Sequence, residues 1–168
     1  MQERPHIKIE KDSLMKAAQM VAILSVIVCW ALALYYYTKF PASIPIHFDA
    51  AGNPNNFGAR EIIFLLPMLA TILVLGINWL AKYPHILNYA QEVTEQNAAK
   101  LYRASIKMLY IVCAIVGFIL MVCVISISGA VFNEGHKMDN WSLPIILVLS
   151  GMLTVYSIMA AVKSSRIK

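Results

Sequence analysis

The chain has 168 residues, of which 60% are hydrophobic and only 14% are charged. A water-soluble domain has about 45–50% apolar and about 25% charged residues, so this composition, with a mean hydropathy of +0.66, excludes an ordinary soluble globular domain. The net charge of +5 would suit a nucleic-acid partner, but the distribution of the charges along the chain, described below, argues against that class.

Four long apolar runs follow one another along the chain. They cover residues 17–37, 62–80, 108–132 and 143–162, and none of them contains Lys, Arg, Asp, Glu or His. A helix needs about 20 mostly apolar residues to cross a bilayer, and a buried strand is much shorter than these runs. The sequence therefore predicts an all-α membrane protein with four transmembrane helices, forming a single integral membrane domain over residues 1–168.

The basic residues are distributed unevenly between the segments that connect these runs. Of the 14 Lys and Arg residues, four precede the first run, four lie between the second and third, and three follow the fourth. Only Lys39, Arg60 and Lys137 lie in the first and third loops. Because basic residues are retained in the cytoplasm, both termini are expected inside and the 40–60 loop outside. Topology and anionic lipid explain the basic residues without nucleic acid, so the expected partner is the lipid bilayer.

The loop of residues 40–60, after the first run, is rich in residues that fix turns. Pro41 and Pro45 restrict φ and lack an N–H group, which predicts an extended backbone rather than a helix. Gly52, Pro54 and Gly58 then predict a turn and a return. We expect a short hairpin or a compact extended loop that folds over the outer ends of the helices.

An extended backbone divides the first half of this loop into two faces. One face is predicted to carry Ile44, Ile46 and Phe48, which can pack against helix ends. The opposite face is predicted to carry Pro45, His47 and Asp49. The two polar residues would then lie together on the outer side of the loop.

Four hypotheses remain open for His47 and Asp49. In the first, Asp49 orients His47 and caps a turn, and in the second the pair belongs to a surface that binds an external ligand. In the third, His47 and Asp49, joined by His136 of the third loop, bind a metal such as zinc, although an H-x-D pair alone is a weak signal. The fourth is His–Asp catalysis, but the chain has no evident outer nucleophile and no H-E-x-x-H motif. The sequence therefore predicts no enzyme and no cofactor.

The third helix is predicted to begin in the cytoplasm, well before its apolar run. Thr94 can cap it, and residues 98–105 repeat apolar positions at helical spacing. This extension, residues 94–107, would either dock on the other inner segments or bind a cytoplasmic partner through Tyr102 and Arg103. Four thin helices enclose little volume, so a homodimer is also compatible with the sequence.

The stretch FPASIPIHFDAAGNPNNFGAR resembles the signature of the bacterial family called domain of unknown function 1648. The resemblance also takes in YPHILNYAQEVTEQNAAKLYR and covers roughly residues 20 to 110. The signature positions matched are Pro41, Ile44, Pro45, His47, Phe48, Gly52, Gly58 and Arg60. Phe40 replaces the usual Leu, and Asp49 stands where the family often has Asn.

This resemblance implies a multi-pass protein of the bacterial cytoplasmic membrane with a role in envelope defence or sensing. The best-understood relatives are immunity proteins for a sporulation-delaying toxin, which protect the membrane from a secreted peptide and hold a repressor there. Those relatives have more spans and a Gly-Tyr-Arg-Thr stretch that this sequence lacks. The resulting hypothesis is an immunity- or sensor-type protein that binds an external peptide or lipid. The candidate binding residues are His47, Phe48, Asp49, Asn53, Asn56 and Arg60.

Overall fold

The structure is a computed structural model that describes residues 4–165, and it is mostly helical. The helices are α1 (Ser13–Tyr37), α2 (Leu65–Leu80), α3 (Ala98–Phe132) and α4 (Ser142–Ser165); the strands are β1 (Ser43–Phe48) and β2 (Pro54–Ala59); short 3-10 turns are η1 (Arg60–Phe64), η2 (Pro84–Ile86) and η3 (Glu134–His136). Four helices, one of them running from Arg60 through η1 and α2, are long and apolar enough to cross a membrane. The predicted class, a helical protein with four such helices, is confirmed.

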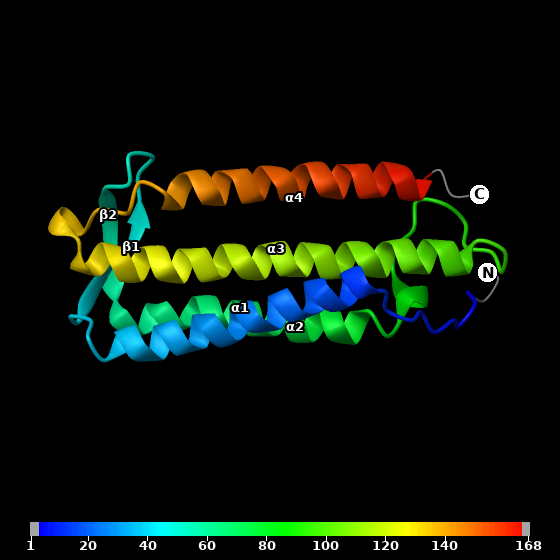
Figure 1. The fold of residues 1–168 in the computed structure, drawn as a ribbon, viewed down its shortest axis with the longest axis horizontal. Coiled ribbons are helices and arrows are strands. Elements are labelled where there is room, and N and C mark those ends of the chain that lie inside the picture. Colours follow the sequence, from blue (N-terminus) through cyan, green and yellow to red (C-terminus); the bar gives the residue numbers. More distant parts are fainter. Residues whose placement is uncertain (1–3, 166–168) are drawn as a thin grey trace.

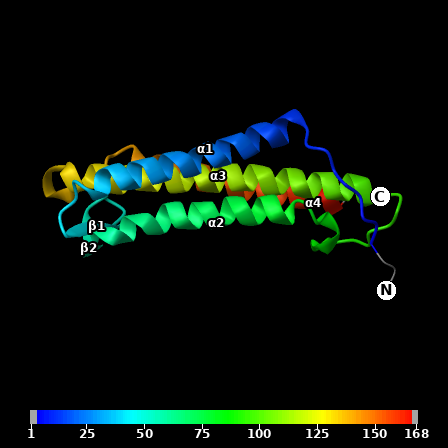
Figure 2. The ribbon, with the colours of Figure 1, turned by 90° about the horizontal axis from the view of Figure 1, so that it is seen from below.

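Helix α3 is the centre of the arrangement (Figure 1). Helices α1 and α2 lie along one side of α3, and α4 lies along the other (Figures 1 and 2). The hairpin of β1 and β2 covers one end of the bundle, whereas the start of α1 and the end of α4 lie at the opposite end. We call these the hairpin end and the terminal end.

Small side chains lie where α1 and α3 meet at Gly117. Gly117 of α3 faces Ser25 and Ala22 of α1, and an added β-carbon would lie 3.5 Å from the β-carbon of Ser25. Small residues allow helix backbones to approach closely, which favours association where lipid leaves no hydrophobic driving force. By contrast, α4 packs against α3 with only Ser142 buried among its residues.

The helices begin at residues that differ from those predicted. Asp12 caps α1 by accepting a hydrogen bond from the Met15 amide at 2.9 Å, so α1 begins at Ser13, before its apolar run. Regular α3 begins at Ala98 rather than at Thr94. Thr94 and Asn97 exchange side chain–backbone hydrogen bonds of 2.9 and 3.4 Å just before it, which is a reciprocal cap.

The extension of α3 at the terminal end is covered by the chain itself. Ile7, Ile9 and Tyr89 pack on a buried cluster that contains Leu101 and Tyr102. Tyr102 has no exposed surface, so of the two alternatives for residues 94–107, its position fits docking on the rest of the chain. The apolar face to which Tyr102 belongs packs on the N-terminal segment and on the segment before α3, while Arg103 remains exposed.

Candidate functional site

The 40–60 loop folds as a two-stranded antiparallel hairpin. Ile44 pairs with Gly58 and Phe48 pairs with Pro54, and the register shifts on both sides of His47. Pro45 is fully buried beside Ile44, so the prediction that it shares an exposed face with His47 and Asp49 is wrong. That prediction assumed that side chains alternate strictly between the two faces of the strand. The alternation fails at the irregularity after Pro45, because an extra residue in one strand changes which side chains share a face.

Asp49 holds the turn of the hairpin. Its Oδ1 accepts hydrogen bonds from the amides of Ala51 (2.9 Å) and Asn53 (2.8 Å), and its Oδ2 accepts one from the Asn53 side chain (3.1 Å). The bonds from Asn53 chiefly, with smaller effects of Ala51 and Lys137, lower the pKa of the Asp49 carboxyl below its usual value. Asp49 and Asn53 thus stabilise the turn itself.

His47 is exposed, and its partner is not Asp49. Its Nδ1 lies within hydrogen-bonding distance of Asn55 Oδ1, across the hairpin. Of the first hypothesis, the part in which Asp49 caps a turn agrees with these contacts, whereas the part in which Asp49 orients His47 is wrong, because Asp49 is occupied by the turn amides. Asn56 accepts a hydrogen bond from the Phe57 amide at 2.9 Å, so Asn56 also contributes to the local structure of β2.

The turn is docked on the segment between α3 and α4. Gly52 is buried with a φ of +78°, and its carbonyl accepts a hydrogen bond from the Met138 amide at 2.8 Å. A β-carbon at this position would lie 3.4 Å from the Met138 carbonyl oxygen. The left-handed backbone favours glycine here, whereas the contact of a β-carbon with Met138 would be an ordinary one.

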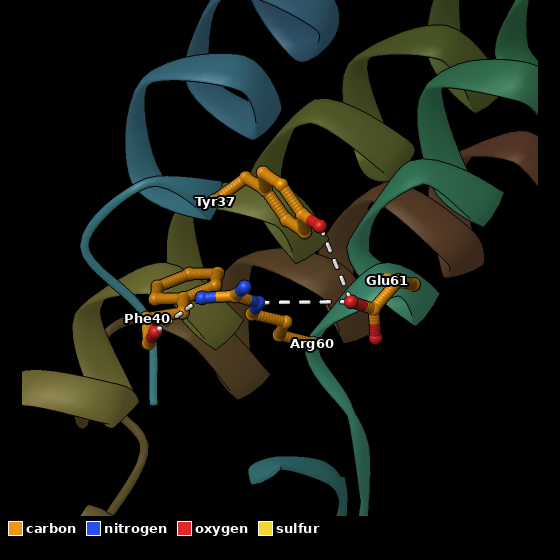
Figure 3. Close-up of polar contacts among 4 residues, drawn as sticks. All are labelled: Tyr37, Phe40, Arg60 and Glu61. Atoms are coloured by element: carbon orange, nitrogen blue, oxygen red, sulfur yellow. Dashed lines mark hydrogen bonds and ion pairs between the residues drawn. The ribbon is translucent and has the colours of Figure 1, made fainter. Parts of the chain in front are cut away.

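Arg60, which follows β2, contacts Phe40, which precedes β1, and so links the two ends of the hairpin (Figure 3). Its Nη1 donates a hydrogen bond to the Phe40 carbonyl at 3.2 Å, and its Nε lies 3.6 Å from Glu61 Oε1. Tyr37 lies under the guanidinium, 4.7 Å from Cζ to the ring centroid, and its hydroxyl donates to Glu61 Oε1 at 3.2 Å. These contacts assign Arg60 a structural role.

The remaining predicted loop residues surround this framework. Gly58 is closely packed, since a β-carbon there would lie 2.8 Å from Ile62 Cδ1 and 2.9 Å from Ile46 Cδ1. Pro41 is exposed before β1, and Pro54 begins β2.

His136 contacts the hairpin through Phe57 rather than through His47. The His136 and Phe57 ring centroids are 6.0 Å apart, and His136 Nδ1 lies 3.0 Å from the Val131 carbonyl oxygen. Within residues 4–165, the structure brings together no group of three metal-ligating side chains. The alternative of a metal site at His47, Asp49 and His136 therefore receives no geometric support.

A pocket of about 300 Å³ lies behind β1, where the hairpin meets α2, α3 and α4. Its lining is mostly apolar, and Asp49 is the charged residue on it. We call it the outer pocket, and its lining residues are Ile46, His47, Phe48, Asp49, Leu66, Cys123, Ser126, Ile127, Met138, Leu143 and Ile146. It therefore joins three of the predicted binding residues to a wall that sequence reasoning did not identify.

The six predicted binding residues thus separate into two groups. His47, Phe48 and Asp49 line the outer pocket. Asn53, Asn56 and Arg60 make the structural contacts described above and are absent from the pocket lining. Apart from Met138, which lies in the segment between α3 and α4, the missed wall residues come from the long apolar runs. In these runs no local pattern distinguishes a pocket residue from a lipid-facing one.

The ionised state of Asp49 leads to a pH-dependent prediction. Because the pKa of Asp49 is lowered by folding, its stabilising contribution is present above its unfolded pKa of about 3.9 and is lost as the pH falls through the lower folded value. Asp49→Asn retains an acceptor oxygen for the turn amides but does not titrate. We expect the thermal midpoint of the wild type to fall more than that of Asp49→Asn on acidification below about pH 4. If the thermal midpoints of the wild type and Asp49→Asn fall in parallel as the pH is lowered, the Asp49 carboxylate does not stabilise the turn.

Comparison with known proteins gives one family and one relative. A family model described as "Domain of unknown function (DUF1648)" matches residues 24–71. An uncharacterized protein of Archaeoglobus fulgidus is similar to this chain, with 31% identity over 81 residues, a match that covers 44% of each chain. The chain therefore spans less than half the length of that relative. No solved structure matches the chain significantly.

Proposed function

The chain belongs to the DUF1648 family through residues 24–71, and from this premise we propose that it is a receptor of the immunity or sensor type in the cell membrane. Its external ligand is a peptide with apolar and basic residues, and the outer pocket binds that peptide. The observation that carries the proposal is the pocket itself, about 300 Å³ and walled by the signature hairpin together with α2, α3 and α4. In this proposal both termini are cytoplasmic and the hairpin end is outside, as the distribution of basic residues favours.

The chemistry of the pocket favours a peptide over an anionic lipid. Ile46, Phe48 and Ile146 offer an apolar surface for an anchoring side chain, and burial in such a pocket is the main source of affinity at peptide interfaces. The charged group on the lining is the Asp49 carboxylate, which, like any aspartate with an ordinary or lowered pKa, is anionic at neutral pH. A peptide with apolar and basic residues complements this pocket, whereas a phosphate headgroup would be repelled.

The test is protection of cells, with a pair of matched substitutions. Ile146 lines the outer pocket, whereas its neighbour Ile145 is 38% exposed on α4 and does not line it. Bacteria that express the wild type, Ile146→Trp or Ile145→Trp are challenged with a synthetic amphipathic peptide of Leu and Lys. We expect the wild type and Ile145→Trp to raise the inhibitory concentration, and Ile146→Trp to lose protection at equal protein level because the indole fills the pocket.

Two results would contradict this proposal. One is that Ile146→Trp protects cells as well as Ile145→Trp does, which would show that protection does not depend on the outer pocket. The other is growth inhibition of wild-type cells that matches that of cells without the protein. Purified protein that retains an anionic lipid in the outer pocket would favour a lipid ligand instead.

A further inference from the structure

A second groove lies at the terminal end, opposite to the hairpin, between α3 and α4 with Leu14 of α1 at its edge. Its volume is about 540 Å³, and we call it the inner groove. Helix α3 contributes residues at helical spacing from Lys100 to Ile111, and α4 contributes residues at the same spacing from Tyr156 to Ser164. The lining is Leu14, Lys100, Arg103, Ala104, Lys107, Ile111, Tyr156, Met159, Ala160, Lys163 and Ser164.

Four cationic side chains line this groove, and no carboxylate does. Lys107 is already paired, because its Nζ lies 2.9 Å from Asp12 Oδ2. Within residues 4–165, Lys100, Arg103 and Lys163 have no carboxylate at ion-pair distance, and all three are exposed. Three positive charges on two neighbouring helices are therefore available to an anionic group.

The uncharged part of the groove lies further along the helices. Ile111 is 11 residues from Lys100 along α3, which corresponds to about 16 Å at 1.5 Å per residue. Met159, one turn before Lys163 on α4, is 65% exposed. The groove thus has cations at its terminal end and an apolar surface that continues toward the middle of the bundle.

We propose that the inner groove is a binding site for one anionic phospholipid. Arg103 and Lys163, with Lys100, bind the phosphate, and one acyl chain lies along Ile111 and Met159. Basic pockets between transmembrane helices fit anionic headgroups, and each Lys or Arg near the membrane surface contributes about 1 kcal/mol to such binding. A soluble acidic peptide would satisfy the charges but would leave the apolar surface without a partner.

The test counts bound lipid by native mass spectrometry of the purified full-length chain, titrated with phosphatidylglycerol and, separately, phosphatidylcholine. We expect one retained phosphatidylglycerol and no comparable phosphatidylcholine. The double variant Arg103→Gln/Lys163→Gln should weaken phosphatidylglycerol binding about 25-fold, because each of the two removed charges should contribute about five-fold to that binding. The matched control is Lys16→Gln/Lys82→Gln, which removes two exposed charges that do not line the groove and should leave binding unchanged.

A second pair of variants separates lipid binding from simple anion binding. Ala160→Trp fills the apolar part of the groove and retains every charge, whereas Ile158 is 59% exposed and does not line the groove. We expect Ala160→Trp to release phosphatidylglycerol and Ile158→Trp to retain it. Four results would overturn the proposal. The two double Gln variants could lose phosphatidylglycerol equally, or the wild type could retain the two lipids equally. Binding could be unchanged in Ala160→Trp, or inorganic phosphate could displace the lipid.

Discussion

Ile44→Ala should lower the free energy of unfolding by about 2–5 kcal/mol, the range for removing most of a buried aliphatic side chain. Ile44 is 1% exposed. It belongs to a buried cluster with Ala33 of α1, Ile63 of η1 and Val124 of α3, so it attaches β1 to three other elements. Its loss would leave a cavity where the hairpin meets the helices, and the bulk of the destabilisation should appear at the hairpin end.

The measurement is the thermal midpoint in detergent, together with protease sensitivity of the hairpin. Phe57→Ala is the control, because Phe57 is a larger side chain in the same hairpin but is 47% exposed. We expect Phe57→Ala to change stability by much less. Equal midpoints for Ile44→Ala and the wild type would show that the hairpin is not held to the bundle through this cluster.

Gly117→Leu should destabilise the α1–α3 interface by about 1–3 kcal/mol through overpacking. The β-carbon of an alanine at this position would meet Ser25 Cβ at 3.5 Å, an ordinary contact, but the longer leucine has to displace α1. Gly117→Ala should therefore be tolerated, with a small gain from its higher helix propensity. The two substitutions at one position separate the effect of side-chain size from the effect of removing glycine.

The matched control for the leucine substitution is Gly151→Leu on α4. A β-carbon at Gly151 meets no atom within 4 Å, so leucine there should not lower stability. Thermal midpoints of the three variants and the wild type decide the prediction. A midpoint for Gly117→Leu as high as that for Gly151→Leu would mean that α1 and α3 do not approach as closely as the structure places them.

The helices were predictable because composition alone defines them, but their ends were not. A charge-free run of about 20 residues needs no tertiary information to indicate a spanning helix. Helix ends depend on individual side chains, such as Asp12 before α1 and the exchange between Thr94 and Asn97 before α3. These caps lie outside the apolar runs, so the runs mark the helices without marking their first residues.

The hairpin could be predicted from the sequence, whereas the hydrogen-bond partners of its side chains could not. Prolines and glycines favour a turn and return, and the structure has a hairpin there. The register shifts around His47 place it opposite Asn56 and near Asn55, which strict alternation does not anticipate. Asp49 accepts hydrogen bonds from nearby turn amides, and a sequence does not rank such local donors against a neighbouring histidine.

The wall of the outer pocket could not be predicted from the sequence. Leu143 and Ile146 lie on α4, which is apolar on every side, so periodicity does not reveal which side faces α3. Met138 reaches the pocket because its amide binds the Gly52 carbonyl, a contact between residues far apart in the chain. The signature loop therefore indicated where a binding site could be, but the residues of the opposite wall could be identified only from the structure.

Binding of a peptide with apolar and basic residues to the outer pocket is tested most directly by equilibrium binding in lipid nanodiscs. A fluorescently labelled amphipathic peptide of Leu and Lys is titrated with wild type, Ile145→Trp and Ile146→Trp. We expect wild type and Ile145→Trp to bind alike and Ile146→Trp to bind at least about ten-fold more weakly, equivalent to about 1.4 kcal/mol. Equal affinity of all three proteins for the peptide would show that the outer pocket is not the binding site.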